Sequence, residues 1–195
     1  MRQLYMGLAV VLTMLALGTG WSNTAVAANT THSAANARQQ LAESMLTDIH
    51  QATWISEGKG PHVIYIFFDP NCPFCHRLYE NTRAWIKQGK VELRWIPVGI
   101  LATTSAGKAA AILGAKNPLQ AFYYNEDHYS KGGGIEEDLA TPAVDKQLKA
   151  NAALLARTGF GAVPIMLFHT SDDTPYLIQG SPPKDKLKII LQNVK

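Results

Sequence analysis

The chain has 195 residues, of which 47% are hydrophobic and 17% are charged. This composition is typical of a globular protein and excludes a fibrous repeat or a disordered chain. The formal net charge is only +3, and no run of basic residues is interleaved with aromatic ones, so nucleic acid is not an expected partner.

The N-terminal segment has the anatomy of a secretory signal peptide. Arg2 supplies a positive start, residues 7–17 form a compact apolar run, and Ala25-Val26-Ala27 is a small-residue cleavage site. The apolar run is short for a membrane span, although an uncleaved anchor remains an alternative. We therefore predict a signal peptide over residues 1–27, cleaved after Ala27, and an exported protein.

The next region, residues 28–60, is expected to hold a disordered start and a linker-type helix. Residues 28–34 are small and polar, which favours disorder. From Asn36 to about Gln51 the apolar residues recur at helical spacing, on a face formed by Leu41, Met45, Leu46 and Ile49. A cluster of turn-forming residues at 56–61 should follow this helix.

A buried strand and a helix come next. Residues 62–68 are continuously apolar and rich in β-branched and aromatic side chains, which predicts a central strand. Pro73 suits the first position of a helix, which should run to Lys87 and end at Gly89. Residues 91–100 alternate well enough for a second strand.

The second half of the chain continues the α/β pattern. A glycine-rich loop is expected at 130–142, between helices, and two strands joined by a turn are expected near the C-terminus. The expected helices of this half cover residues 105–115, 118–129, 142–157 and a final stretch that begins near 181. The sequence predicts one domain over residues 61–195, with a helical insertion at about 103–159.

The chain has two cysteines, Cys72 and Cys75, and His76 follows them directly. The C-x-x-C spacing indicates a redox dithiol, whereas C-x-x-C-H is also the attachment box for a c-type haem. A purely structural disulfide is the poorer use of this pair, because so small a loop contributes only about 2 kcal/mol.

The expected position of the cysteines favours thiolate chemistry. Cys72 falls at the start of a helix, where unpaired N–H groups and the helix dipole stabilise an anion and lower a thiol pKa. Cys72 would then be the attacking sulfur, and the more buried Cys75 would resolve the mixed disulfide. Pro73, Phe74, His76 and Asp69 are possible modulators, although Asp69 is better explained as a cap of the turn into the helix.

The order of elements resembles the thioredoxin fold, in which a cis-proline loop lies against the C-x-x-C. Val163-Pro164 opens a strand pair after a long helix, at the place of that proline. The resemblance narrows to the DsbC/DsbG family of periplasmic thiol:disulfide isomerases and reductases. It rests on F-x-D-P-x-C-P-[aromatic]-C, on "GKVELR", and on "AAAILGAKNP" at residues 109–118.

This resemblance implies a function and partners. Cys72 would be the nucleophile, Cys75 the resolving thiol, and Pro164 the cis-proline beside which a substrate chain pairs. The implied activity is the reduction or isomerisation of disulfides in partly folded exported proteins in the periplasm. It also implies a membrane reductant of the DsbD kind and no cofactor.

Two departures from the family pattern change these expectations. Family members carry an N-terminal dimerisation domain before the linker helix, whereas only the helix is expected here, so we expect a monomer. Family members usually have Thr before the cis-proline, whereas Val163 is closer to the DsbA oxidases. A dithiol oxidase therefore remains the alternative activity.

The sequence gives less support to three other classes of function. A c-type haem could take Met166 or a histidine as second axial ligand, but the box follows a buried strand in an α/β pattern, which does not favour haem. Structural zinc needs four ligands, and the histidines show no paired spacing, so no metal site is expected. A secreted chaperone or binding protein on a thioredoxin scaffold is the non-enzymatic alternative.

Overall fold

The computed structural model describes residues 23–130 and 132–195. The described residues divide into two units, one that holds residues 23–34 and one that begins at residue 35 and extends to 195. The apolar run of the expected signal peptide lies outside the described residues, while residues 28–34, expected to be disordered, are instead part of helix α1 (Asn23–Asp48). Among the residues that the structure describes, no helix is both long enough and apolar enough to cross a membrane.

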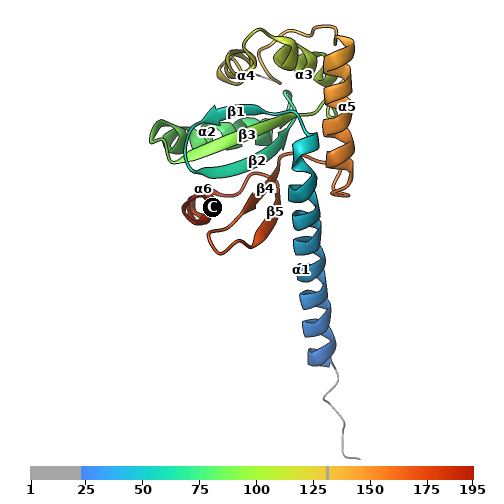
Figure 1. Cartoon of the computed structure of the whole chain (residues 1–195), viewed down its shortest axis with the longest axis vertical. Coiled ribbons are helices and arrows are strands. Elements are labelled where there is room, and N and C mark those ends of the chain that lie inside the picture. The colour runs from blue at the N-terminus through green and yellow to red at the C-terminus, as the bar shows by residue number, and fades with distance from the viewer. Residues whose placement is uncertain (1–22, 131) are drawn as a thin grey trace, which may run out of the picture. The chain divides into compact units, whose positions relative to one another are not determined.

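The second unit is built on a mixed five-stranded sheet with the strand order β1-β3-β2-β4-β5 (Figure 1). β2 and β3 run parallel, and the remaining neighbours are antiparallel. β2 lies at the centre, as its continuously apolar sequence predicted. The strands are β1 (Ile55–Gly58), β2 (His62–Phe68), β3 (Val91–Pro97), β4 (Ile165–His169) and β5 (Pro175–Gln179).

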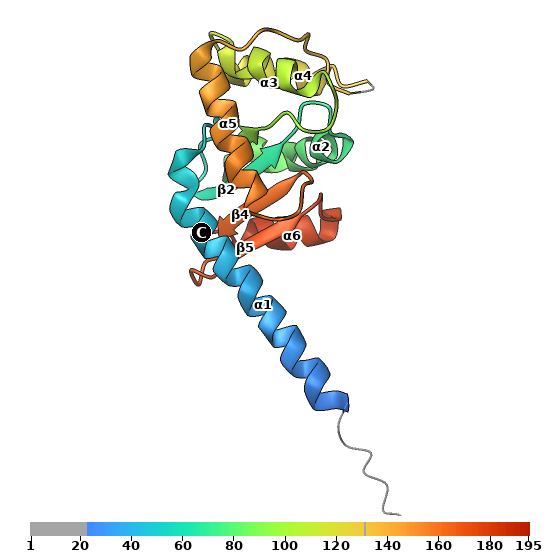
Figure 2. The same cartoon turned by 90° about the vertical axis from the view of Figure 1, so that its right-hand side faces the viewer.

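Helices cover both faces of this sheet, which confirms the expected α/β class. Figure 2 shows α2 and α6 on one side of the strands, and α5 with residues 35–48 of α1 on the other. α3 and α4 form the helical insertion together with α5. After the 3-10 turn Ile49–Gln51, the helices are α2 (Pro73–Lys87), α3 (Ser105–Gly114), α4 (Pro118–Asp127), α5 (Pro142–Ala156) and α6 (Lys184–Asn193).

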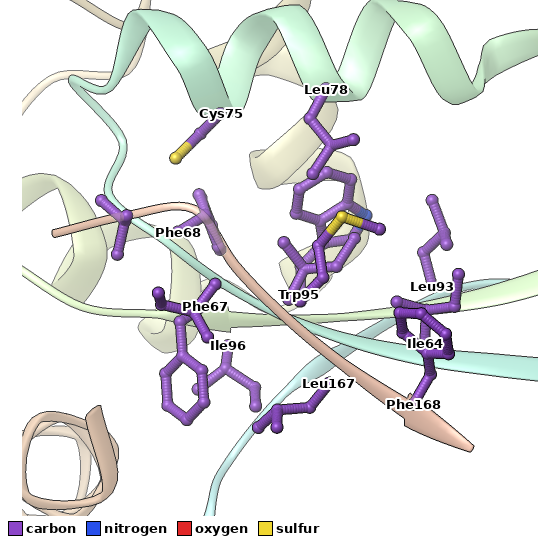
Figure 3. Packing of buried hydrophobic residues seen from close by; sticks show 14 of the residues in the cluster. Ile64, Phe67, Phe68, Cys75, Leu78, Leu93, Trp95, Ile96, Leu167 and Phe168 are labelled. Carbon is purple, nitrogen blue, oxygen red and sulfur yellow. The ribbon is translucent and has the colours of Figure 1, made fainter. Parts of the chain in front are cut away.

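The core lies between α2 and the central strands. Figure 3 shows Cys75 and Leu78 pointing from α2 toward the sheet, where Phe68 and Trp95 lie. These side chains are fully buried or nearly so. The ring of Phe68 meets the ring of Trp95 edge to face, with 5.7 Å between centroids. Cys75, the second cysteine of the motif, is therefore part of the hydrophobic core.

The edge strand β1 differs from the sequence prediction, which places a turn at residues 56–61. Ile55–Gly58 pairs antiparallel with β3, and Ile55 lies opposite Trp95. Gly58 has φ +83°, and a Cβ there would lie 2.4 Å from the Val91 carbonyl oxygen. Only glycine fits this close approach, so the residue that indicated a turn in fact permits the strand to pair.

Candidate functional site: the Cys72–Cys75 dithiol

The two cysteines lie at the N-terminus of α2, as the sequence predicted. Cys72 is the N-cap residue and Pro73 the first helical residue. The Cys72 sulfur accepts a hydrogen bond from the backbone N–H of Cys75 at 3.2 Å. A sulfur at this position satisfies one of the unpaired N–H groups of the helix and meets the positive end of its dipole.

The loop before β4 packs against the dithiol. The Val163–Pro164 peptide bond is cis, and both residues are buried. The Cys72 thiol lies 3.5 Å from the Val163 carbonyl oxygen and donates to it. Tertiary structure thus brings the predicted cis-proline loop, Val163-Pro164, against Cys72, although Val163 lies 91 positions later in the chain.

Both sulfurs are less accessible than expected for a pair with one outer cysteine. Cys72 is 2% exposed and Cys75 is 1% exposed, and both are free thiols. Their electrostatic surroundings nevertheless differ. The pKa of Cys72 is lowered, first by a hydrogen bond from the Cys75 side chain, then by the backbone N–H groups of Cys75 and Phe74. The pKa of Cys75 is raised well above its ordinary value, mainly by burial.

We expect the ultraviolet absorbance of the reduced protein to show Cys72 ionising first, with a midpoint below that of Cys75. Cys75→Ala should move this midpoint upward, because it removes the side-chain hydrogen bond that contributes most to the lowered pKa of Cys72. Cys72→Ala should leave no thiolate at neutral pH, since Cys75 then remains buried and protonated. A thiolate that forms at neutral pH in Cys72→Ala would contradict this assignment.

Asp69 shapes the turn that leads into α2. Its carboxylate is fully buried and accepts from the backbone N–H of Asn71, Ile100 and Leu101 and from the hydroxyl of Ser105, at 2.7–3.0 Å. These contacts agree with the interpretation of Asp69 as a cap. The backbone N–H of Asp69 also lowers the pKa of Cys75, against the larger effect of burial. Asp69 therefore fixes the path of the chain just before Cys72.

His76 contacts the helical insertion and not the dithiol. Its Nδ1 lies 3.1 Å from Glu126 Oε2, and its ring stacks on Tyr129 with 4.3 Å between centroids. The Tyr129 hydroxyl donates to the Asn71 carbonyl oxygen at 3.0 Å. The helical insertion is thereby attached to the residues just before and just after the C-x-x-C.

The aromatic residues near the motif divide as expected. Phe67 and Phe68 are fully buried in the core, whereas Phe74, between the cysteines, is 51% exposed. The guanidinium of Arg77 lies 5.1 Å from the centre of the Phe74 ring. Phe74 therefore presents an apolar surface directly beside the buried sulfurs.

Sequence reasoning missed Asn71, Ser105 and Glu126. Asn71 donates to Thr104 and Ser105 at 2.9 Å, and Glu126 is almost fully buried beside His76. None of the three belongs to a motif with a recognisable spacing. The one signal available was a carboxylate in an aromatic helix, and it did not distinguish Glu126 from Asp127.

Comparison with known proteins shows the family of this chain and two similar curated proteins. Residues 49–195 match the family described as "Thioredoxin-like domain". The chain is 37% identical over 154 residues to the thiol:disulfide interchange protein DsbG of Pseudomonas aeruginosa, and 29% identical over 150 residues to DsbG of Escherichia coli. These alignments cover 77% and 74% of this chain, but only 60% and 59% of the relatives' own length.

Solved structures support the same fold. A linker-deletion mutant of Proteus mirabilis ScsC superposes with a TM-score of 0.68 at 19% identity, covering 92% of this chain and 97% of that one. The thiol-disulfide exchange protein α-DsbA2 of Wolbachia pipientis gives a TM-score of 0.62 at 16% identity, covering 80% and 97%. The expected thioredoxin-like fold with a helical insertion is confirmed.

Proposed function

This chain belongs to the family of thioredoxin-like domain proteins, and from that premise we propose that it is a thiol:disulfide oxidoreductase acting through Cys72 and Cys75. The observation that carries the proposal is the unequal pair of thiols. One sulfur caps a helix and has a lowered pKa, while the other is buried in the core with a raised pKa. In such a pair, one sulfur can attack as a thiolate, while the other stays protonated until it resolves the mixed disulfide.

The reaction follows from this division. The Cys72 thiolate attacks one sulfur of a substrate disulfide, which forms a mixed disulfide and releases the other substrate sulfur as a thiolate. Cys75 then loses its proton and attacks the sulfur of Cys72. The products are the Cys72–Cys75 disulfide and the second substrate thiolate, so two electrons pass to the substrate.

The proposed substrates are disulfides of partly folded exported proteins, in the periplasm. The support is the similarity to DsbG, together with the predicted signal peptide at residues 1–27. The exposed ring of Phe74 and the cis Val163-Pro164 loop are the surfaces proposed to meet the substrate chain. A membrane reductant of the DsbD kind is the proposed source of electrons that restores the dithiol.

A dithiol oxidase is the second candidate, and Val163 favours it. Its side chain stands where the DsbC/DsbG pattern has a hydroxyl, while its carbonyl oxygen contacts the Cys72 sulfur. The reduction potential of the Cys72–Cys75 pair separates a dedicated reductant from an oxidase or isomerase. A strongly oxidising value favours an oxidase or isomerase, and a value near that of thioredoxin favours a reductant.

Cys75→Ala is expected to trap the mixed disulfide with a protein that contains scrambled disulfides. The variant keeps the attacking sulfur but lacks the thiol that releases the substrate. Non-reducing electrophoresis should show a covalent complex that disappears on addition of dithiothreitol. The matched control is Cys72→Ala, which should form no complex because the remaining Cys75 is buried and protonated. Equal complexes from both variants would refute the assigned roles.

A further inference from the structure

Glu126 is a buried carboxylate that the exchange reaction described above does not use. Its side chain is 2% exposed, and it is tied to both ends of the segment that carries the cysteines. Oε2 lies 3.1 Å from His76 Nδ1, and His76 directly follows Cys75. Oε1 accepts from Asn125 Nδ2 at 3.0 Å, and the same amide donates to the Pro70 carbonyl oxygen, two residues before Cys72.

This carboxylate and the two thiols influence one another's charge. Burial raises the pKa of Glu126 to about 7, although the hydrogen bonds from His76 and Asn125 lower it. The charge of Cys72 raises this pKa further, and the charge of Glu126 in turn raises the pKa of Cys75. Negative charge on the dithiol and on Glu126 therefore oppose each other at neutral pH.

Other ionisable groups face the same region, where an open cavity of about 490 Å³ lies between α2 and α4. Two of them are engaged with other partners, since Arg83 pairs with Glu57 and Asp127 accepts from the Tyr79 hydroxyl. The remaining groups include a surface carboxylate 3.7 Å from His76 Nε2, a tyrosine under the imidazole ring and the buried cap of the turn: Glu80, Tyr129 and Asp69. His76 thus connects buried Glu126 with the surface.

We propose that reduction of the Cys72–Cys75 disulfide is coupled to proton uptake by Glu126, and that His76 holds Glu126 in place for this coupling. The inference rests on the proposed function, because it concerns the redox equilibrium of the same dithiol. Glu126 acts on the dithiol through its charge, and none of the contacts described above joins it to either sulfur.

The reaction with glutathione shows where the proton goes. Two glutathione thiols reduce the disulfide and give glutathione disulfide, the Cys72 thiolate, the Cys75 thiol and one proton. Two electrons pass from the glutathione sulfurs to the protein sulfurs. The new Cys72 thiolate raises the pKa of Glu126. In a fraction of the molecules in which Glu126 is ionised before reduction, Glu126 therefore binds the released proton.

The coupling predicts a pH-dependent difference between the wild-type protein and Glu126→Gln. At low pH Glu126 is neutral in both redox states, so the two proteins should have the same equilibrium constant with glutathione. Above the pKa of Glu126 its negative charge destabilises the reduced wild-type protein, and the variant should favour the reduced form by about tenfold, which is a coupling of one pKa unit. That tenfold corresponds to about 30 mV.

The experiment measures this equilibrium constant from about pH 5.5 to 8.5, on both sides of the raised pKa. The ratio of variant to wild type should rise from about one to about tenfold across this range. Asp127→Asn is the matched control, since it removes the adjacent, exposed carboxylate of α4 and should keep the ratio constant. His76→Phe keeps a ring on Tyr129 but loses the bond to Glu126, so the pH range of proton uptake should move upward.

The outcomes separate this inference from the proposed function. A dithiol that does not exchange with glutathione at any pH would refute the proposed function. A dithiol that exchanges normally, with a ratio independent of pH, would refute the coupling alone. If Glu126→Gln does not fold, NMR titration of the Glu126 carboxyl carbon in the wild-type protein decides the matter. Its pKa should be higher in the reduced than in the oxidised protein, and equal values overturn the proposal.

Discussion

Cys72→Ser is expected to reduce the rate of disulfide exchange to that of the protein-free reaction. The serine oxygen is close in size to the sulfur, but it is not ionised at neutral pH and forms no disulfide. The loss should be complete, because the raised pKa of Cys75 keeps that thiol protonated. Turbidity during insulin reduction by dithiothreitol or glutathione measures the rate.

The fold of the Cys72→Ser variant should be preserved, so that a loss of exchange rate reports the missing sulfur and not unfolding. Serine is a favoured N-cap residue, so it can accept from the Cys75 N–H as the sulfur does. Circular dichroism and the unfolding midpoint should therefore stay close to those of the wild type. A Cys72→Ser protein that still accelerates insulin reduction would exclude the dithiol mechanism. Retained protection of unfolded chains without exchange would instead favour the chaperone alternative.

Arg83→Met is expected to lower the free energy of unfolding by about 3–5 kcal/mol, which is the effect of breaking a buried ion pair. Glu57 on β1 is fully buried, and Arg83 on α2 donates to both of its carboxylate oxygens. The variant keeps an unbranched apolar side chain but leaves the Glu57 charge in the core. The indole N–H of Trp95, at 2.8 Å, is then its main remaining donor. Urea titration at neutral pH measures the change.

Two further variants test the physical cause of this loss. Arg157→Met removes a half-exposed ion pair with Asp48 and should lower the free energy of unfolding by no more than about 1 kcal/mol. Glu57→Gln combined with Arg83→Met removes the buried charge but keeps an acceptor for Trp95. This double variant should be more stable than Arg83→Met alone. Equal losses of unfolding free energy in Arg83→Met and Arg157→Met would show that leaving the Glu57 charge buried adds no further cost.

Residues close together in the sequence determined one part of the site. The apolar stretch 62–68, Cys72 at the helix start and Pro73 at its first position predicted β2, α2 and the dithiol, and the structure has these elements at the same bounds. Periodicity, capping and backbone restriction act over a few residues, which is why the sequence alone reveals them. The cis bond at the proline before β4 was predicted only because the place of this proline after a long helix resembles a known pattern.

Tertiary structure decided everything that depends on distant partners. Glu57 looked like part of a surface turn, but Arg83, 26 positions away, allows it to be buried in an edge strand. Glu126 looked like one more acidic residue of a helix, but docking of the helical insertion places it against His76, 50 positions away. The pKa of a carboxylate depends on burial and on the charges around it, and local sequence contains neither. The sequence by itself therefore determined that two thiols lie at the start of α2, whereas docking of the helical insertion decides which buried carboxylate lies beside His76.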